Sequence, residues 1–306
     1  MKEALKVWGP VALGTLIAVI IALRVIAPPP PRAITFAAGA PDGSYYALAE
    51  QYRDALAEHG VKVTVRETAG TGENYQLLLS GDADVALLQG GLAAEAERDA
   101  VLTLGGVFPE PFWILVRRDL AVNDFGDLRI ARIAAGIPGS GTRALANDMS
   151  AAWGGRWADF LPLSGEAAVT ALKEGDVDAA VFATAVDTPY IQTLLQDPTL
   201  QALSIRRAQG LSMNYPALAP MTLYEGVISL DPNIPARDVS LVAAIAQLGV
   251  DRKLHPALQA VLLEAAEDIH RGGSALTRAG TFPNPTDIDL PRRILNACRV
   301  GSCSRV

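Results

Sequence analysis

The chain has 306 residues, half of them apolar, which is enough to bury the core of one large or two medium-sized domains. Its 26 basic and 33 acidic residues give a net charge of −7, and no basic stripe alternates with aromatic residues, which argues against nucleic-acid binding. Both cysteines, Cys298 and Cys303, lie near the end of the chain, so the body has neither a disulfide framework nor a cysteine-based zinc site.

The first segment in chain order is a membrane-anchor candidate. Val7 to Leu23 carry no charge, and about 20 apolar residues suffice to cross the ~30 Å hydrocarbon core of a bilayer. We therefore predict an anchor over residues 1–27 and a stiff proline-rich spacer over residues 28–32. The alternative is a cleaved signal peptide with Lys2 and Lys6 as its charged start, but no A-x-A cleavage site is present.

After the spacer, one supersecondary unit occurs twice, about 95 residues apart. Each copy has a strand, a loop rich in Gly, Ser and Thr, a helix, and a Gly-Asp-x-Asp turn into a second apolar strand. The strand, loop, turn and second strand of the first copy are Ile34–Ala37, Ala38–Ser44, Gly81–Asp84 and Val85–Leu88. Those of the second copy are Ile133–Ala135, Gly136–Thr142, Gly175–Asp178 and Ala179–Phe182. Strands alternate with helices, so the pattern predicts two similar α/β lobes.

The remaining elements follow from hydrophobic periodicity. We read Phe112–Val116 as a first strand crossing between the lobes and Leu223–Leu230 as the strand that returns. Two helices, Ala236–Leu248 and Pro256–His270, close the body. Two crossing strands imply two hinges and a cleft that closes on a ligand. The expected domains are lobe 1 over 33–115, lobe 2 over 116–218, a return to lobe 1 with closing helices over 219–290, and a tail over 291–306.

Catalysis is the weakest interpretation of the sequence. The three histidines, His59, His255 and His270, lie at predicted helix ends, where capping or dipole compensation explains them. The loop Gly139–Thr142 lacks the lysine of a nucleotide-binding P-loop, and no hydrolase or zinc-protease motif occurs. The aspartates of the two Gly-Asp-x-Asp turns fit turn positions better than a metal or acid–base pair. We predict a protein that is not an enzyme and holds neither a cofactor nor a metal.

The two Gly-rich loops are the predicted binding features. A strand that ends in such a loop and opens a helix presents unpaired N–H groups and the positive end of the helix dipole, and two of them facing across a cleft suit a small anion. One loop alone would be only a turn, whereas two in register favour a ligand role. Spacing turns Tyr45 inward and leaves Tyr46 as the pocket candidate. Arg143 is either a solvated surface residue or an inward partner for a carboxylate.

Four sequence blocks, taken together and in this order, resemble a known family. They are Gly39–Tyr46, Glu67–Asn74, Gly81–Asp84, and Gly136–Thr142 followed by Ala144. Over about residues 33–290 the chain is similar to the TAXI-type solute receptors of TRAP transporters. The resemblance implies a type II periplasmic-binding-protein fold in the periplasm or extracytoplasmic space. It also implies capture of a small carboxylate, such as glutamate or another organic acid, for a TRAP-type permease.

Matching positions in the resemblance imply the ligand contacts. They are Ser44, Tyr46, Thr71, Asn74, Gln89, Ser140, Gly141, Thr142 and Thr184, to which the loops add Gly43 and Arg143. Three features depart from the family pattern. Pro41-Asp42 replaces glycine and brings a carboxylate that would repel an anion unless it is turned out, Gly90-Gly91 replaces a frequent polar pair, and the chain begins with an anchor.

The expected function is therefore that of a membrane-anchored extracytoplasmic receptor for a small anionic solute. The alternative keeps the fold and changes the role. The protein would then be a tethered ligand sensor or interaction module that signals through a protein partner.

Overall fold

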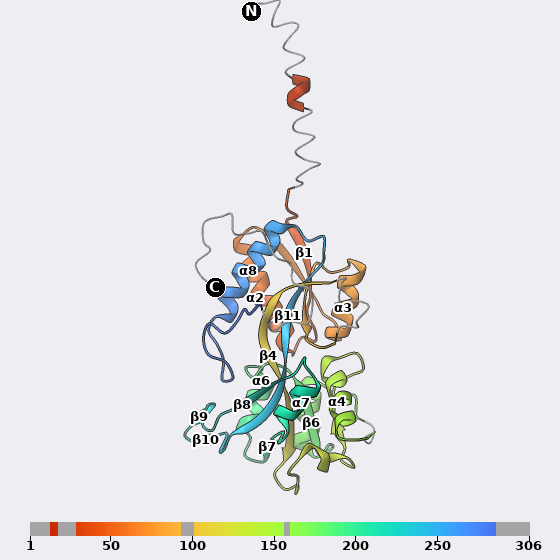
Figure 1. Cartoon of the computed structure of the whole chain (residues 1–306), viewed down its shortest axis with the longest axis vertical. Helices are drawn as coiled ribbons and strands as arrows, with labels where there is room; N and C mark the ends of the chain where they lie inside the picture. The colour runs from red at the N-terminus through yellow and green to blue at the C-terminus, as the bar shows by residue number, and fades with distance from the viewer. Residues whose placement is uncertain (1–12, 18–28, 93–100, 156–159, 286–306) are drawn as a thin grey trace, which may run out of the picture.

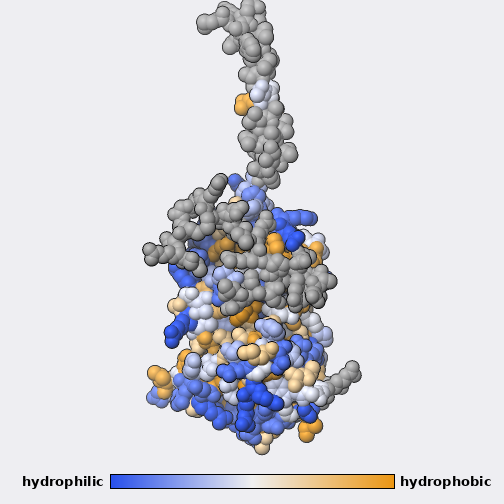
Figure 2. Space-filling model, viewed as in Figure 1, coloured by the Kyte–Doolittle hydropathy of each residue, from blue (hydrophilic) through white to orange (hydrophobic). Residues whose placement is uncertain are grey.

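The computed structural model describes residues 13–17, 29–92, 101–155 and 160–285. In it, two lobes are stacked end to end and joined by two long strands (Figure 1). On the face shown in Figure 2, hydrophobic residues are scattered among hydrophilic ones, as is normal for a surface that faces water. The predicted anchor over residues 1–27 lies outside the described residues except for 13–17, which are helical. Within the described ranges, no helix has the length and apolarity needed to cross a membrane.

Lobe 1 is built around parallel strands connected by helices. The first strand pairs in parallel with the second on one side and with the third on the other, and parallel neighbours need helical crossovers. The sequence repeat predicted this alternation, and the structure confirms it. The elements of lobe 1 are β1 (Ala33–Ala37), α2 (Ser44–Glu58), β2 (Lys62–Arg66), α3 (Thr71–Ser80), β3 (Val85–Gln89) and α8 (Pro256–His270).

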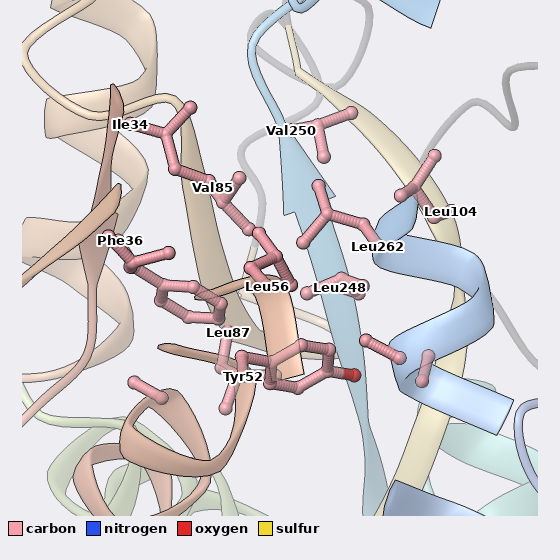
Figure 3. Close-up of a cluster of buried hydrophobic side chains, with 14 of the residues drawn as sticks. Ile34, Phe36, Tyr52, Leu56, Val85, Leu87, Leu104, Leu248, Val250 and Leu262 are labelled. Carbon is pink, nitrogen blue, oxygen red and sulfur yellow. The ribbon is translucent and has the colours of Figure 1, made fainter. Parts of the chain in front are cut away.

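The core of lobe 1 lies between its sheet and the helices α2 and α8 (Figure 3). Tyr52 and Leu56 are fully buried because they occupy one face of α2, one helical turn apart. Each large apolar side chain buried here stabilises the fold by about 1.5–3 kcal/mol. The strand and α8 residues that meet them are Ile34, Phe36, Val85, Leu87, Leu248, Val250 and Leu262.

Lobe 2 repeats the arrangement with a shorter sheet, in which a two-residue strand pairs in parallel with a five-residue strand. Core clusters lie on both faces of this sheet, one around Phe112 and Phe125 and the other around Trp113 and Phe182. The helices are η1 (Phe125–Leu128), α4 (Gly141–Ala152), α5 (Gly165–Glu174), α6 (Pro189–Gln196) and α7 (Ala208–Asn214). The strands are β5 (Ile133–Ala134), β6 (Ala179–Ala183), β7 (Leu200–Ala202), β8 (Ala219–Leu223), β9 (Ser229–Leu230) and β10 (Asn233–Ile234).

Two antiparallel strands, β4 (Leu102–Arg117) and β11 (Val239–Val250), run side by side through both lobes (Figure 1). They give the sheet order β2-β1-β3-β11-β4-β6-β5, with β7 beside β4 and β8 beside β11. The predicted first crossing, Phe112–Val116, lies within β4 and is confirmed.

The predicted return strand is wrong. The chain returns through β11 and not through Leu223–Leu230, and β11 falls where the sequence predicted the helix Ala236–Leu248. Because β11 is hydrogen-bonded on both edges and buried on both faces, nearly all of its residues are apolar, and apolar residues do not alternate with polar ones. A continuous run rich in Ala and Leu fits a buried helix equally well, so periodicity cannot tell the two apart.

Candidate functional site

Four helices begin at one cavity between the lobes. The residues that precede their first turns, Gly43 of α2, Gly70 of α3, Ser140 of α4 and Ser164 of α5, all line this cavity, whose volume is about 120 Å³. Two of the helices belong to lobe 1 and two to lobe 2. Each helix start carries a partial positive charge and N–H donors. The site therefore combines four weak positive ends in one small space, which we call the polar chamber.

Two threonines anchor the helix starts to strand ends in the same way in each lobe. The Thr71 Oγ1 atom accepts a hydrogen bond from the Gln89 N–H at 3.1 Å, at the end of β3. The Thr142 Oγ1 atom accepts one from the Ala183 N–H at 3.0 Å, at the end of β6. A hydroxyl that accepts in this way keeps its own proton for donation. Both threonines line the polar chamber, so each can hold the fold and offer a donor to a ligand.

The lobes touch each other across the cleft. The Thr184 hydroxyl donates to the Ser44 Oγ atom at 3.0 Å, which joins the residue that follows β6 of lobe 2 to α2 of lobe 1. On another side, a side-chain carbon at Gly72 would lie 2.8 Å from the carbonyl oxygen of Gly139, so only glycine allows α3 to approach the α4 loop. The described arrangement is therefore a closed one.

Asp42 is the carboxylate that would repel an anion unless it is turned out, and it is turned to a specific partner. Its Oδ2 atom accepts a hydrogen bond from the Glu166 N–H at 3.0 Å, at the start of α5. The preceding residue of that helix, Ser164, does not cap it with its own side chain. Asp42 therefore caps a helix of the other lobe, and its charge is partly compensated there by the helix dipole.

Glu110 lies at the base of the cleft, on the crossing strand β4. Its side chain lines the polar chamber, the residue is 2% exposed, and its Oε2 atom accepts a hydrogen bond from the Tyr45 hydroxyl at 2.7 Å. Burial raises the pKa of Glu110 to about 8, which the Tyr45 hydrogen bond only partly offsets. Burial, together with the nearby Glu110, also raises the pKa of Tyr45. At neutral pH the carboxyl is therefore mostly protonated and is itself a hydrogen-bond donor.

The structure brings together eight of the predicted site residues and leaves three outside. The polar chamber is lined by Gly43, Ser44, Thr71, Gln89, Ser140, Gly141, Thr142 and Thr184. Tyr46 instead packs, half-buried, against the core of lobe 1. Asn74 is fully buried below the chamber, where its Nδ2 group donates to the carbonyl oxygens of Ala38 and Leu87, each at 2.9 Å.

Arg143 follows neither of the two predicted alternatives. Its guanidinium is half-buried within lobe 2 and donates to the backbone carbonyl oxygens of Ala135, Gly136, Phe160 and Leu161. This burial lowers its pKa. Among the described residues, the side chains with a carboxyl group that line the polar chamber are Asp42 and Glu110, and neither Lys nor Arg lines it.

Among the chamber residues that were not predicted from the sequence are three with ionisable side chains, Tyr45, Glu110 and Tyr190. Tyr45 had been assigned to the core, and it does contact Phe108 there, yet its hydroxyl reaches the chamber wall at Glu110. Glu110 carried a usable signal, because it is the single charge in the long apolar run from Leu102 to Val116. An ionisable residue inside a buried strand needs a reason to be there. Tyr190 carries no comparable signal. No group of three metal-ligating side chains occurs in the described ranges.

The chain has the mixed α/β two-lobe fold of periplasmic binding proteins, as comparison with solved structures shows. A Bordetella bronchiseptica RB50 protein has a TM-score of 0.54 at 18% identity, over 79% of this chain and 73% of that chain. The alkanesulfonate-binding protein SsuA from Xanthomonas axonopodis pv. citri, bound to MOPS, has 0.52 at 20%, over 78% and 73%. An ancestral arginine-binding protein bound to arginine has 0.51 at 16%, over 80% and 95%.

The chain belongs to the NMT1-like family, whose model matches residues 36–256. No curated protein matches the sequence. The two-lobe fold expected from the sequence is confirmed, whereas the TAXI-type assignment stays a prediction.

Proposed function

We propose that the protein is a membrane-anchored extracytoplasmic receptor that captures a small carboxylate-type solute in the cleft between its lobes. The observation that carries this proposal is the convergence of four helix starts, two from each lobe, on the polar chamber, of which Asp42 caps the start of α5 and the starts of α2, α3 and α4 remain for a solute. Hydroxyl groups of Ser44, Thr71 and Thr142 stand at three of these starts. Anions bind at helix starts because N–H groups and the helix dipole both favour negative charge there.

The two acidic residues of the chamber are compatible with an anionic solute. Asp42 accepts a hydrogen bond at the start of α5, where the helix dipole partly compensates its charge. Glu110 is held mostly neutral, since burial raises its pKa to about 8. A protonated carboxyl donates a hydrogen bond to a carboxylate where an ionised one would repel it. A site without a lysine or arginine in its described lining can therefore still hold an anion.

The same proposal assigns a TRAP-type permease as the partner and residues 1–27 as the tether. The support for both is the sequence, through the family resemblance and the apolar run Val7–Leu23. The crossing strands β4 and β11 supply what such a receptor needs, because they connect the lobes and let occupancy of the cleft change their separation.

Native mass spectrometry and calorimetry test the proposal on the full chain in detergent micelles. A carboxylate that co-purifies or titrates into the protein supports it. Ser44→Ala should weaken that carboxylate about tenfold or more, because a hydrogen bond to a charged group contributes roughly 1.5–3 kcal/mol. Ser212→Ala, at a partly exposed position of α7 that does not line the polar chamber, is the matched control and should leave the affinity unchanged. A protein that binds no carboxylate, alone or with a permease, contradicts the proposal.

A further inference from the structure

A second and larger cavity adjoins the polar chamber. Its volume is about 450 Å³, within the roughly 300–1,000 Å³ that organic ligands of moderate size require. We call it the apolar chamber. Like the polar chamber it lies between the lobes, with walls from α2, β4 and α8 of lobe 1 and from the segment 185–190 of lobe 2.

Like the polar chamber, this cavity has more apolar than polar wall, and it differs from that chamber in its greater volume and in its larger number of bulky apolar side chains. The side chains that set its character are Leu48, Val107, Phe108, Val186, Ile269 and Phe282. His270 contributes a neutral ring, because burial lowers its pKa to about 4, and that ring is stacked on Phe108 with centroids 5.8 Å apart. Among the described lining residues, the full charges are at the rim, on Asp42, Glu166 and Asp187. Binding of apolar groups to such a surface is favourable, whereas binding of ions to it is not.

The two chambers lie next to each other and share one wall. Asp42, Gly43, Ser44 and Tyr190 line both of them. The hydrogen bond from the Thr184 hydroxyl to Ser44 lies at this shared wall, and the Thr184 and Thr188 hydroxyls are 2.9 Å apart, one on each side. Of these two contacts, only the Thr184–Ser44 bond joins the two lobes, because Thr184 and Thr188 both belong to lobe 2. A ligand that spans both chambers has to replace the Thr184–Ser44 bond.

Resting on the proposed function, we infer that the solute is an amphipathic organic acid whose carboxylate lies at the helix starts of the polar chamber while its apolar chain or ring fills the apolar chamber. The polar chamber alone, at about 120 Å³, has room for roughly four water-sized groups, which limits a ligand confined to it. A small, wholly polar acid would leave the apolar walls against water. An acid with an apolar body uses both chambers and passes where Ser44 and Thr184 now meet.

Calorimetry with straight-chain carboxylates from acetate to decanoate tests this inference. The full chain is held in detergent micelles, and dialysis sets the concentration of free ligand. Affinity should rise about fourfold with each added methylene until the chamber is full. Succinate and glutamate should bind more weakly than octanoate. An affinity that is independent of chain length, or tighter for the polar acids, overturns the inference and leaves the proposed function standing. If no carboxylate of either kind binds, the proposed function itself fails.

Substitutions at exposed wall positions separate the two chambers. Ala47 and Gln51 lie on the face of α2 that lines the apolar chamber, and both are exposed. Ala47→Trp or Gln51→Trp should weaken octanoate at least tenfold and leave acetate unchanged, because the ring occupies the space of the chain. Ala57→Trp, exposed on the same helix away from both cavities, is the matched control. If both chamber variants fold and bind octanoate normally, the chain does not lie in this chamber and the inference is wrong.

Discussion

Asp42 of lobe 1 and Glu166 of lobe 2 are joined by a hydrogen bond of 3.0 Å from the Glu166 N–H to the Asp42 carboxylate. The contact depends on Gly165, where a side-chain carbon would collide with that carboxylate and where φ is +50°. Only glycine adopts that backbone conformation easily. One residue thus caps a helix of the other lobe and helps to keep the cleft closed.

Asp42→Asn and Asp42→Ala should separate the two roles of this residue. Asparagine keeps an acceptor for the Glu166 N–H and removes the charge, so a bound carboxylate should gain roughly 0.5–1 kcal/mol at low salt, and less at high salt. Alanine removes the cap as well, so small-angle scattering of the ligand-free protein should show a larger radius of gyration. Calorimetry at two salt concentrations measures the first effect. Equal affinities and equal scattering profiles for all three proteins would mean that the contact neither repels the ligand nor closes the cleft.

The paired threonines predict a matched pair of variants. Thr71→Val and Thr142→Val remove the hydroxyls that accept the Gln89 and Ala183 N–H groups. Each should lower the free energy of unfolding by about 1–3 kcal/mol, because an N–H loses its partner. Each should also weaken a carboxylate, since the same hydroxyl faces the chamber. Denaturant unfolding and calorimetry measure the two effects. A stability loss without any change in affinity would restrict these threonines to a structural role.

The sequence predicted the parts of the fold that have a local repeat, and it failed where burial between distant segments determines the structure. The strand–loop–helix unit was identified because it occurs twice, and both copies form as expected. The strand β11 was missed because its role comes from distant partners, β3, β4 and β8, and not from its own pattern. A run that contains Ala243, Ala244 and Ala246 has good helix propensity, which tertiary pairing overrides.

The candidate site shows a similar division. Glycines and hydroxyl residues at helix starts could be placed from the sequence, because the loop geometry itself brings them to the cleft. The directions of the side chains could not be predicted from the sequence. Arg143 turns to carbonyl groups of its own lobe, and Asn74 ties β1 to β3 below the chamber. Their hydrogen-bond partners are up to 36 residues away in sequence, so the neighbouring residues do not indicate these roles.

The anchor gives a prediction that is independent of the site. Residues 1–27 should remain on the mature protein, since the prolines that follow Ala27 disfavour signal cleavage. Membrane fractionation followed by N-terminal sequencing tests this. Full-length protein in the membrane fraction is the expected result, and a soluble form that starts near residue 28 would refute it.

His270 should make the protein sensitive to mild acid. Burial lowers its pKa to about 4, whereas an unfolded histidine has about 6.5. Between these values the unfolded state binds a proton that the native state does not, so stability falls as pH drops from 6.5 to 4, by up to about 3 kcal/mol. His270→Gln should flatten this slope in denaturant unfolding. His59→Gln, at an exposed helix end, should not, and a slope that survives in His270→Gln would assign it to other groups.

Glu110 should give the opposite pH dependence. Its pKa is about 8 in the folded protein and about 4.5 in the unfolded chain. The native state therefore keeps a proton that the unfolded state releases between these values. Stability from this group is present below pH 4.5 and is lost as pH rises through 8, by at most about 5 kcal/mol. Glu110→Gln stays neutral and should remove that slope in denaturant unfolding.

Ligand binding should follow the same titration. A carboxylate needs protonated Glu110, so its affinity should be nearly constant up to about pH 8 and then fall about tenfold for each pH unit. Glu110→Gln keeps a donor and removes the titration, so its affinity should stay flat across this range. Tyr45→Phe removes the hydrogen bond that favours the ionised form, so the fall should begin at higher pH. Calorimetry from pH 6 to 10 distinguishes an anionic solute from a cationic one. If affinity instead rises through pH 8 and Glu110→Gln abolishes binding, Glu110 holds a cationic group and the solute is not a simple anion.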